Sequence, residues 1–178
     1  MAVSEQIRSD VWVAMLDVGR QSRYYGKQFE KYSKRQSVIE SVLLVSGSAG
    51  LVSLATQWTS WIPAICIAAA SLAALIGRTG QYSKKAACLY FIRCDCESLE
   101  QKWELLWSRM ESGLVADEEA LEKNQRLLDA LRIVTDKASL AGLPIDHAAN
   151  QIAWEEAIQV KQGQYAENNR DQGILATT

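Results

Sequence analysis

The chain has 178 residues, 19 basic and 21 acidic side chains and a net charge of −2, which fits one domain or a small membrane module with a soluble helical part. Two prolines, and few glycines outside the central apolar region, favour helix over sheet, and alternating strand patterns are absent. Four cysteines without a CxxC pair, and a single distant histidine, argue against zinc and for reduced thiols.

Residues 1–36 are predicted to form a cytoplasmic N-terminal helix. Apolar side chains recur near heptad positions, and Gly26 is only a mild interruption. The helix is therefore expected to run into the apolar region that follows. Its heptad positions hold Ile7, Val11, Ala14, Val18, Tyr25 and Tyr32.

Residues 41–77 contain no Asp, Glu, Lys, Arg or His, and the run breaks near Gln57 and Pro63. Each half is about long enough to cross a hydrocarbon core, which takes roughly 17–25 apolar residues. We therefore predict a transmembrane hairpin at 37–80, with spans at about 39–57 and 61–77. A soluble protein with a buried hairpin is the weaker alternative, because a core helix usually keeps a polar stripe.

Basic residues crowd both outer ends of this hairpin, whereas its central turn has no charge. The positive-inside rule then predicts that both termini are cytoplasmic. Tyrosines interleave with the basic residues, which favours lipid anchoring over nucleic-acid binding. No cleavable signal peptide is expected, so the hairpin itself would target the chain to the membrane. The predicted interface anchors are Lys31, Lys34, Arg35, Trp58, Trp61, Arg78, Lys84 and Lys85.

Small and weakly polar residues line one face of each predicted span. Such faces let helix backbones approach closely in lipid, and packing within the hairpin is favoured over pore lining for any single residue. No ionisable group lies inside either span, which argues against a pump or transporter. The residues predicted to pack or to line a pore are Ser46, Gly50, Ser53, Gln57, Ala69, Ala73 and Gly77.

Residues 81–112 are predicted to continue the second span as a long cytoplasmic helix that ends near Gly113. Apolar residues alternate spacings of three and four over about three heptads, as in a coiled-coil seam. This cytoplasmic seam consists of Leu89, Ile92, Cys96, Leu99, Trp103, Leu106 and Met110.

A C-terminal helical pair is predicted at 117–162, one helix starting at Asp117 and the other capped by Asp146. Residues 163–178 are expected to be a flexible tail. Two groups of residues are candidates for a binding site. The tryptophans are better interpreted as core or interface residues, and the acidic residues of the long helix as a solvated helix face. These groups are Trp103, Trp107, Trp154, Asp95, Glu97, Glu100 and Glu104.

No nucleophile with a base, metal cluster or phosphate loop is recognisable, so an enzyme is not predicted, and neither is a cofactor or a direct small-molecule substrate. The sequence thus predicts an all-α membrane protein. Its two-span transmembrane hairpin continues into long cytoplasmic coiled-coil-like helices, followed by the C-terminal helical pair.

This layout resembles the SLATT-type two-transmembrane effectors of bacterial anti-phage conflict systems, and similar small two-span effectors accompany retrons. The resemblance is architectural and covers about residues 1–112. It implies a pore-forming or membrane-disrupting effector of the bacterial inner membrane, and we expect this chain to act there as a homo-oligomer. Such an effector permeabilises the membrane, and growth stops or the cell dies, when a cytosolic sensor protein or nucleic-acid-containing sensor complex detects phage.

Residues 117–178 depart from the minimal layout of that family and are expected to dock the partner. The alternative is a membrane anchor or adaptor that recruits a cytosolic partner without conduction. A third reading, a subunit of an enzyme whose catalytic residues lie in another chain, also stays open.

Overall fold

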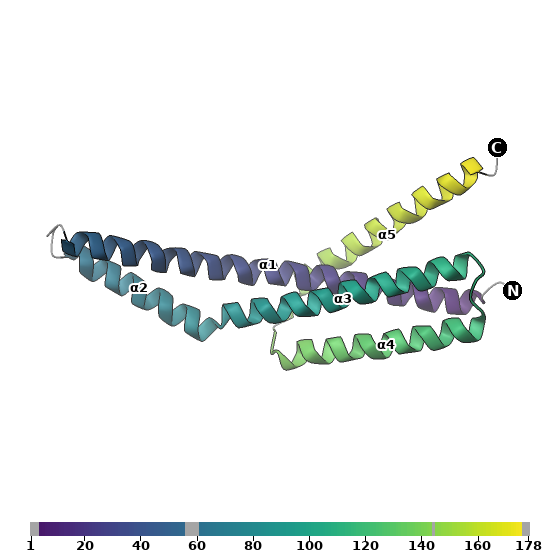
Figure 1. Ribbon diagram of the computed structural model, residues 1–178, viewed down its shortest axis with the longest axis horizontal. Coiled ribbons are helices and arrows are strands. Elements are labelled where there is room, and N and C mark those ends of the chain that lie inside the picture. Colours follow the sequence, from purple (N-terminus) through teal and green to yellow (C-terminus); the bar gives the residue numbers. More distant parts are fainter. Residues whose placement is uncertain (1–3, 56–60, 144, 176–178) are drawn as a thin grey trace. The chain divides into compact units, whose positions relative to one another are not determined.

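The computed structural model describes the backbone of residues 4–55, 61–143 and 145–175, and the side chains of 4–49, 61, 63–143 and 145–163. Every regular element in these ranges is a helix, which confirms the prediction of an all-helical chain. In chain order the elements are α1 (Glu5–Ala55), α2 (Trp61–Gly80), α3 (Tyr82–Glu111), α4 (Asp117–Leu140) and α5 (His147–Leu175) (Figure 1).

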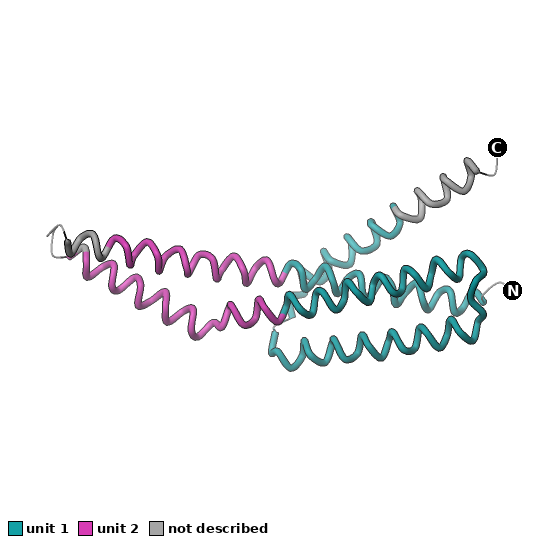
Figure 2. The backbone as a smooth tube through the Cα atoms, viewed as in Figure 1, with its two compact units in different colours: residues 1–27, 89–178 teal, residues 28–88 magenta. Residues whose placement is uncertain are grey.

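The chain divides into two compact units (Figure 2). Unit 1 comprises residues 1–27 and 89–178, and unit 2 comprises residues 28–88. The first half of α1, most of α3, α4 and α5 belong to unit 1. The second half of α1, α2 and the start of α3 belong to unit 2.

Unit 1 is a helical bundle with a continuous apolar core. Figure 1 shows α3 and α4 running antiparallel beside each other. Trp12 of α1 packs on Trp107 of α3, with ring centroids 5.5 Å apart. Asp95 of α3 pairs with Lys137 of α4. The core follows from the heptad spacing of α1 and α3, because apolar residues three and four apart share one helix face.

The helices of unit 1 end at recognisable capping signals. Gly113 has a φ of 68°, and its N–H donates to the carbonyl of Met110 while the N–H of Leu114 donates to that of Arg109. This is the Schellman pattern, in which glycine accepts the left-handed conformation without steric cost. At the start of α5, the Asp146 carboxylate accepts a bond from the N–H of Ala149. The N-cap predicted for Asp146 is present.

Two boundaries differ from the sequence expectation. The predicted continuous helix from the second span is interrupted at Gln81, a non-glycine residue with a φ of 47° between α2 and α3. No proline marks this break. α5 continues to Leu175, although a tail was expected from residue 163. No proline follows Lys161 to stop the helix.

By length and composition, one helical stretch among the described residues could cross a membrane, Pro63–Glu111. Only 6% of its most apolar window is buried, which differs from the mostly buried core helix of a soluble protein. The predicted first span at about 39–57 ends in residues outside the described part of the chain. A two-span topology therefore stays a prediction.

Candidate functional site

The surface of unit 2 is unusually apolar. Its large hydrophobic side chains are exposed on both α1 and α2, with Leu44 74% and Ile67 62% exposed. Exposed apolar side chains in this number on one helical pair indicate contact with lipid or protein, because contact between apolar surface and water is unfavourable. The exposed residues are Val38, Val42, Leu44, Val45, Trp61, Ile65, Ile67, Leu72, Leu75 and Ile76.

A groove of about 420 Å³ lies between α1 and α2. It brings together two residues of the predicted small-residue faces, Ser46 and Ala69. The small faces of the two predicted spans therefore meet within one hairpin. The groove is lined by Ser41, Val42, Val45, Ser46, Ala49, Ile65, Cys66 and Ala69.

Hydroxyl groups of the hairpin donate to their own helix backbone. Ser46 Oγ donates to the carbonyl of Val42, Ser41 Oγ to that of Ser37, and Thr79 Oγ1 to that of Leu75. A hydroxyl bonded in this way needs no water, which makes these residues compatible with a hydrocarbon environment. It also leaves Ser46 without a free donor proton to offer to a pore.

Farther along the hairpin the helices approach more closely. A Cβ placed on Gly77 would lie 3.3 Å from Ile39 Cγ2, and Ala73 is buried. Gly77 thus gives α1 and α2 room to pack. Of the remaining predicted packing or pore-lining residues, Gly50 and Ser53 lie in α1 with side chains outside the described set, and Gln57 lies wholly outside the described residues.

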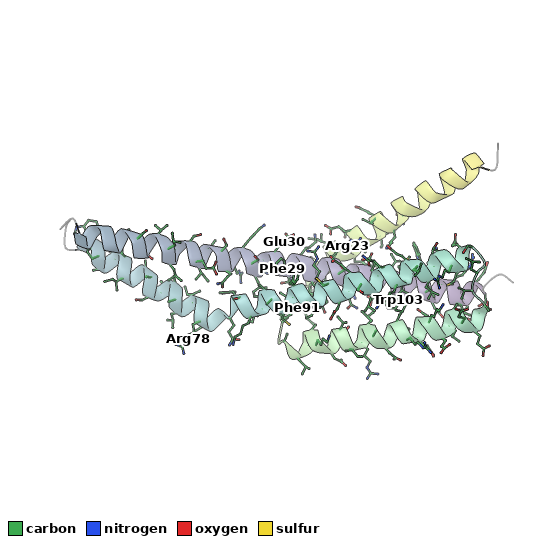
Figure 3. All side chains as sticks on the ribbon, in the orientation of Figure 1. Arg23, Phe29, Glu30, Arg78, Phe91 and Trp103 are labelled. Carbon is green, nitrogen blue, oxygen red and sulfur yellow. The ribbon has the colours of Figure 1, made fainter. Side chains whose placement is uncertain are left out.

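The six basic residues among the predicted interface anchors lie in α1, at the end of α2 and at the start of α3, whereas Trp61 begins α2 at the other end of the hairpin. Lys34, Arg35, Arg78 and Lys84 are exposed, and Figure 3 shows Arg78 turned away from the helices. Lys31 is exposed, Lys85 is half-buried, and Trp61 is 60% exposed. Trp58 lies outside the described residues.

Two of these cations lie over tyrosine rings of the opposite helix. Arg35 Cζ is 5.9 Å from the ring centroid of Tyr82, and Lys85 Nζ is 5.8 Å from that of Tyr32. The two rings are themselves 6.0 Å apart. The spacing of the basic residues had pointed to lipid anchoring but did not indicate this reciprocal pairing.

All seven residues of the predicted cytoplasmic seam are buried in unit 1, none more than 5% exposed. Trp103 is fully buried (Figure 3), and its indole N–H donates to Asn124 of α4. Trp107 packs against Trp12 with the two rings tilted by 52°. The tryptophans of α3 therefore serve the bundle interior, whereas Trp154 on α5 is 38% exposed.

The acidic residues of α3 are paired with basic residues. Asp95 pairs with Lys137, Glu97 with Arg93, and both Glu100 and Glu104 with Lys161. Lys161 itself is almost completely buried. No group of His, Cys, Asp and Glu suited to a metal ion occurs among the residues described.

Two buried titratable groups of unit 1 hold their protons strongly. Burial, followed by the charge of Asp95, raises the pKa of Cys96 to about 12. Burial also raises the pKa of Tyr25 to about 12, with the Cys96 side chain adding to the shift. Because the thiolate is the reactive form of cysteine, Cys96 is an inert structural thiol.

Comparison of the chain with protein-family models, with curated proteins and with solved structures finds no match. The features of unit 2 that bear on function are its exposed apolar side chains, its groove and its basic residues.

Proposed function

We propose that the chain is a two-span membrane protein whose hairpin assembles with further copies and permeabilises the bilayer. One observation carries the proposal, namely the exposed apolar surface on both helices of unit 2. A bilayer can cover this surface without leaving polar groups unpaired. The backbone hydrogen bonds of a helix are satisfied internally, and the hairpin hydroxyls donate to helix carbonyls.

The distribution of charge supports a topology with both termini in the cytoplasm. Basic residues precede the hairpin at Lys34 and Arg35 and follow it at Arg78 and Lys84, whereas residues 41–77 carry no charge. This asymmetry is the pattern expected of a hairpin whose turn faces away from the cytoplasm.

Permeabilisation requires several copies, because two helices cannot enclose a water-filled path. The resemblance to SLATT-type effectors supplies the biological setting, antiviral defence at the bacterial inner membrane. In this setting unit 1 is the cytoplasmic part, and a sensor that detects phage docks on it and releases assembly of the hairpins.

The second candidate function is a non-conducting membrane anchor that recruits a cytosolic partner. The bond from Ser46 to its own helix and its position opposite Ala69 favour this candidate. The polar face that would line a pore is then already used for packing within the hairpin.

Induced expression in bacterial cells tests both candidates. A membrane-impermeant dye and a membrane-potential probe would be followed with the cognate trigger present. Dye entry and depolarisation support the effector. Polarised, dye-free cells overturn it and favour the anchor, which also predicts that an unrelated hairpin in place of residues 37–80 preserves function.

A further inference from the structure

Unit 2 is basic although the whole chain is slightly acidic. It contains six basic residues and only two acidic ones, Glu30 and Glu40, against a net charge of −2 for the chain. The positive-inside rule accounts for the sign of this asymmetry, and the same charges also attract anionic groups at the membrane surface. The basic residues are Lys31, Lys34, Arg35, Arg78, Lys84 and Lys85.

Two of these cations, Arg35 and Lys85, lie over the tyrosine rings described above. Tyr32 and Arg35 lie three residues apart on α1, and Tyr82 and Lys85 lie three residues apart on α3, so each pair shares a helix face. Each cation covers the ring of the other helix. We call these four residues the Tyr–cation cluster.

The cluster leaves its cations without a negative partner. Within the described residues neither Arg35 nor Lys85 forms an ion pair, and each lies over a tyrosine ring. A guanidinium has five N–H donors and an ammonium three, whereas a ring face accepts none of them strongly. A phosphate oxyanion satisfies such donors well, and the guanidinium fork binds it through two bonds.

An apolar stripe continues from Arg35 along the same face of α1. Val38, Val42 and Val45 follow at spacings of three, four and three residues, and they are 62%, 40% and 63% exposed. Val42 and Val45 also line the groove between α1 and α2. Ser41 and Ser46 of that groove donate to backbone carbonyls, so their hydroxyl protons are not offered to an occupant.

A cationic cluster joined to an apolar groove matches an anionic amphiphile. We propose that unit 2 binds one anionic phospholipid, its phosphate on the Tyr–cation cluster and an acyl chain along the groove between α1 and α2. The inference deepens the proposed function and rests on membrane insertion of unit 2. It adds a lipid preference that insertion alone does not require.

Native mass spectrometry of the full chain in detergent tests the proposal. The protein would be exchanged with phosphatidylglycerol or phosphatidylcholine carrying the same acyl chains. We expect phosphatidylglycerol to be retained several-fold more strongly, and we expect the double substitution Arg35→Ala and Lys85→Ala to remove this preference. Replacing both tyrosines by phenylalanine keeps the rings and should keep the preference.

The matched control is the double substitution Lys34→Ala and Lys84→Ala. It removes the same charge from the same two helices, one residue away from the cluster, and should leave the preference intact. Equal loss in this control overturns the site, because net charge alone then explains binding. Displacement of the lipid by glycerol phosphate, which has no acyl chain, overturns the lipid as ligand.

Carbonate extraction of cell membranes separates this inference from the proposed function. If the chain leaves the membrane at alkaline pH, insertion fails and the lipid site fails with it. If the chain stays in the membrane but retains the two lipids equally, the lipid site alone is overturned.

Discussion

The indole N–H of Trp103 donates a 2.8 Å hydrogen bond to the carboxamide oxygen of Asn124, joining α3 to α4 inside unit 1. Trp103 is fully buried and Asn124 is 4% exposed. A buried indole N–H without an acceptor pays its full desolvation cost. This single bond therefore couples the predicted seam of α3 to a polar residue of α4.

The first prediction is that Asn124→Leu lowers the free energy of unfolding by about 1–3 kcal/mol, because it leaves the Trp103 N–H unpaired. Urea unfolding followed by the helical circular dichroism signal measures the change. Adding Trp103→Phe should cost less in the Asn124→Leu background than in the wild type. Additive losses would contradict the coupling.

The second prediction concerns the buried lysine of α5. Lys161 Nζ lies 3.0 Å from Glu100 Oε1 and also pairs with Glu104. Lys161→Ala leaves the Glu100 side chain, which is 15% exposed, with only the more distant Arg23, 3.6 Å away, and should lower the free energy of unfolding by about 1–3 kcal/mol in the same assay.

Arg126 provides the matched control for Lys161. It pairs with Glu122 on the same helix, and both side chains are mostly exposed. Arg126→Ala should therefore change stability by less than about 0.5 kcal/mol. Similar losses for the two substitutions would mean that the ion pairs of Lys161 do not hold α5 on the bundle.

The sequence predicted the parts of this fold that depend on local periodicity. Leu89, Cys96 and Trp103 fall on one face of α3 because a helix repeats every 3.6 residues, so their burial is readable from spacing alone. The apolar character of residues 41–77 could likewise be predicted directly, because the run contains no charged residue.

The features that the sequence did not indicate depend on partners far away in the chain. Lys161 looks like a solvated lysine near a helix end, and only the carboxylates of α3 make its burial tolerable. The reciprocal pairing of Arg35 with Tyr82 needs the approach of α3 to α1. Gln81 carries the positive φ between α2 and α3 although glycine is the usual residue there, and Gly80 directly before it gave only a weak local signal of the break.

The third prediction concerns thiol reactivity in unit 1. Cys96 is fully buried and its pKa is raised to about 12, whereas Cys94 is half-buried. Near neutral pH an alkylating reagent should modify Cys96 at least about tenfold more slowly than Cys94, because little thiolate forms and access is blocked. Mass spectrometry of the labelled peptides gives both rates, and in urea the two should converge. Equal rates in the folded chain would contradict the burial of Cys96.

The same shift in pKa sets a pH dependence. The Cys96 thiol has an ordinary pKa of 9.0, and the folded chain holds its proton up to about 12. The contribution of this group to stability is therefore complete below pH 9.0 and is lost as the pH rises from 9.0 toward 12. Cys96→Ala should flatten the fall in stability over this window, and an unchanged slope would show that other groups cause the alkaline loss.

The last prediction separates packing within the hairpin from assembly between hairpins. Gly77 lies close to Ile39, whereas a side chain at Gly47 would meet nothing within 4 Å. Gly77→Leu should force α1 and α2 apart, and both the folded hairpin and dye entry should be lost. Folding of the hairpin is measured by disulfide crosslinking between cysteines placed at Ser46 and Ala69.

Gly47→Leu adds the same bulk on the open side of the helix, so the crosslink should persist. If dye entry then stops, Gly47 lies where neighbouring copies meet; if dye entry continues, assembly uses another face. Intact crosslinking in the Gly77 variant would refute the close approach of the two helices.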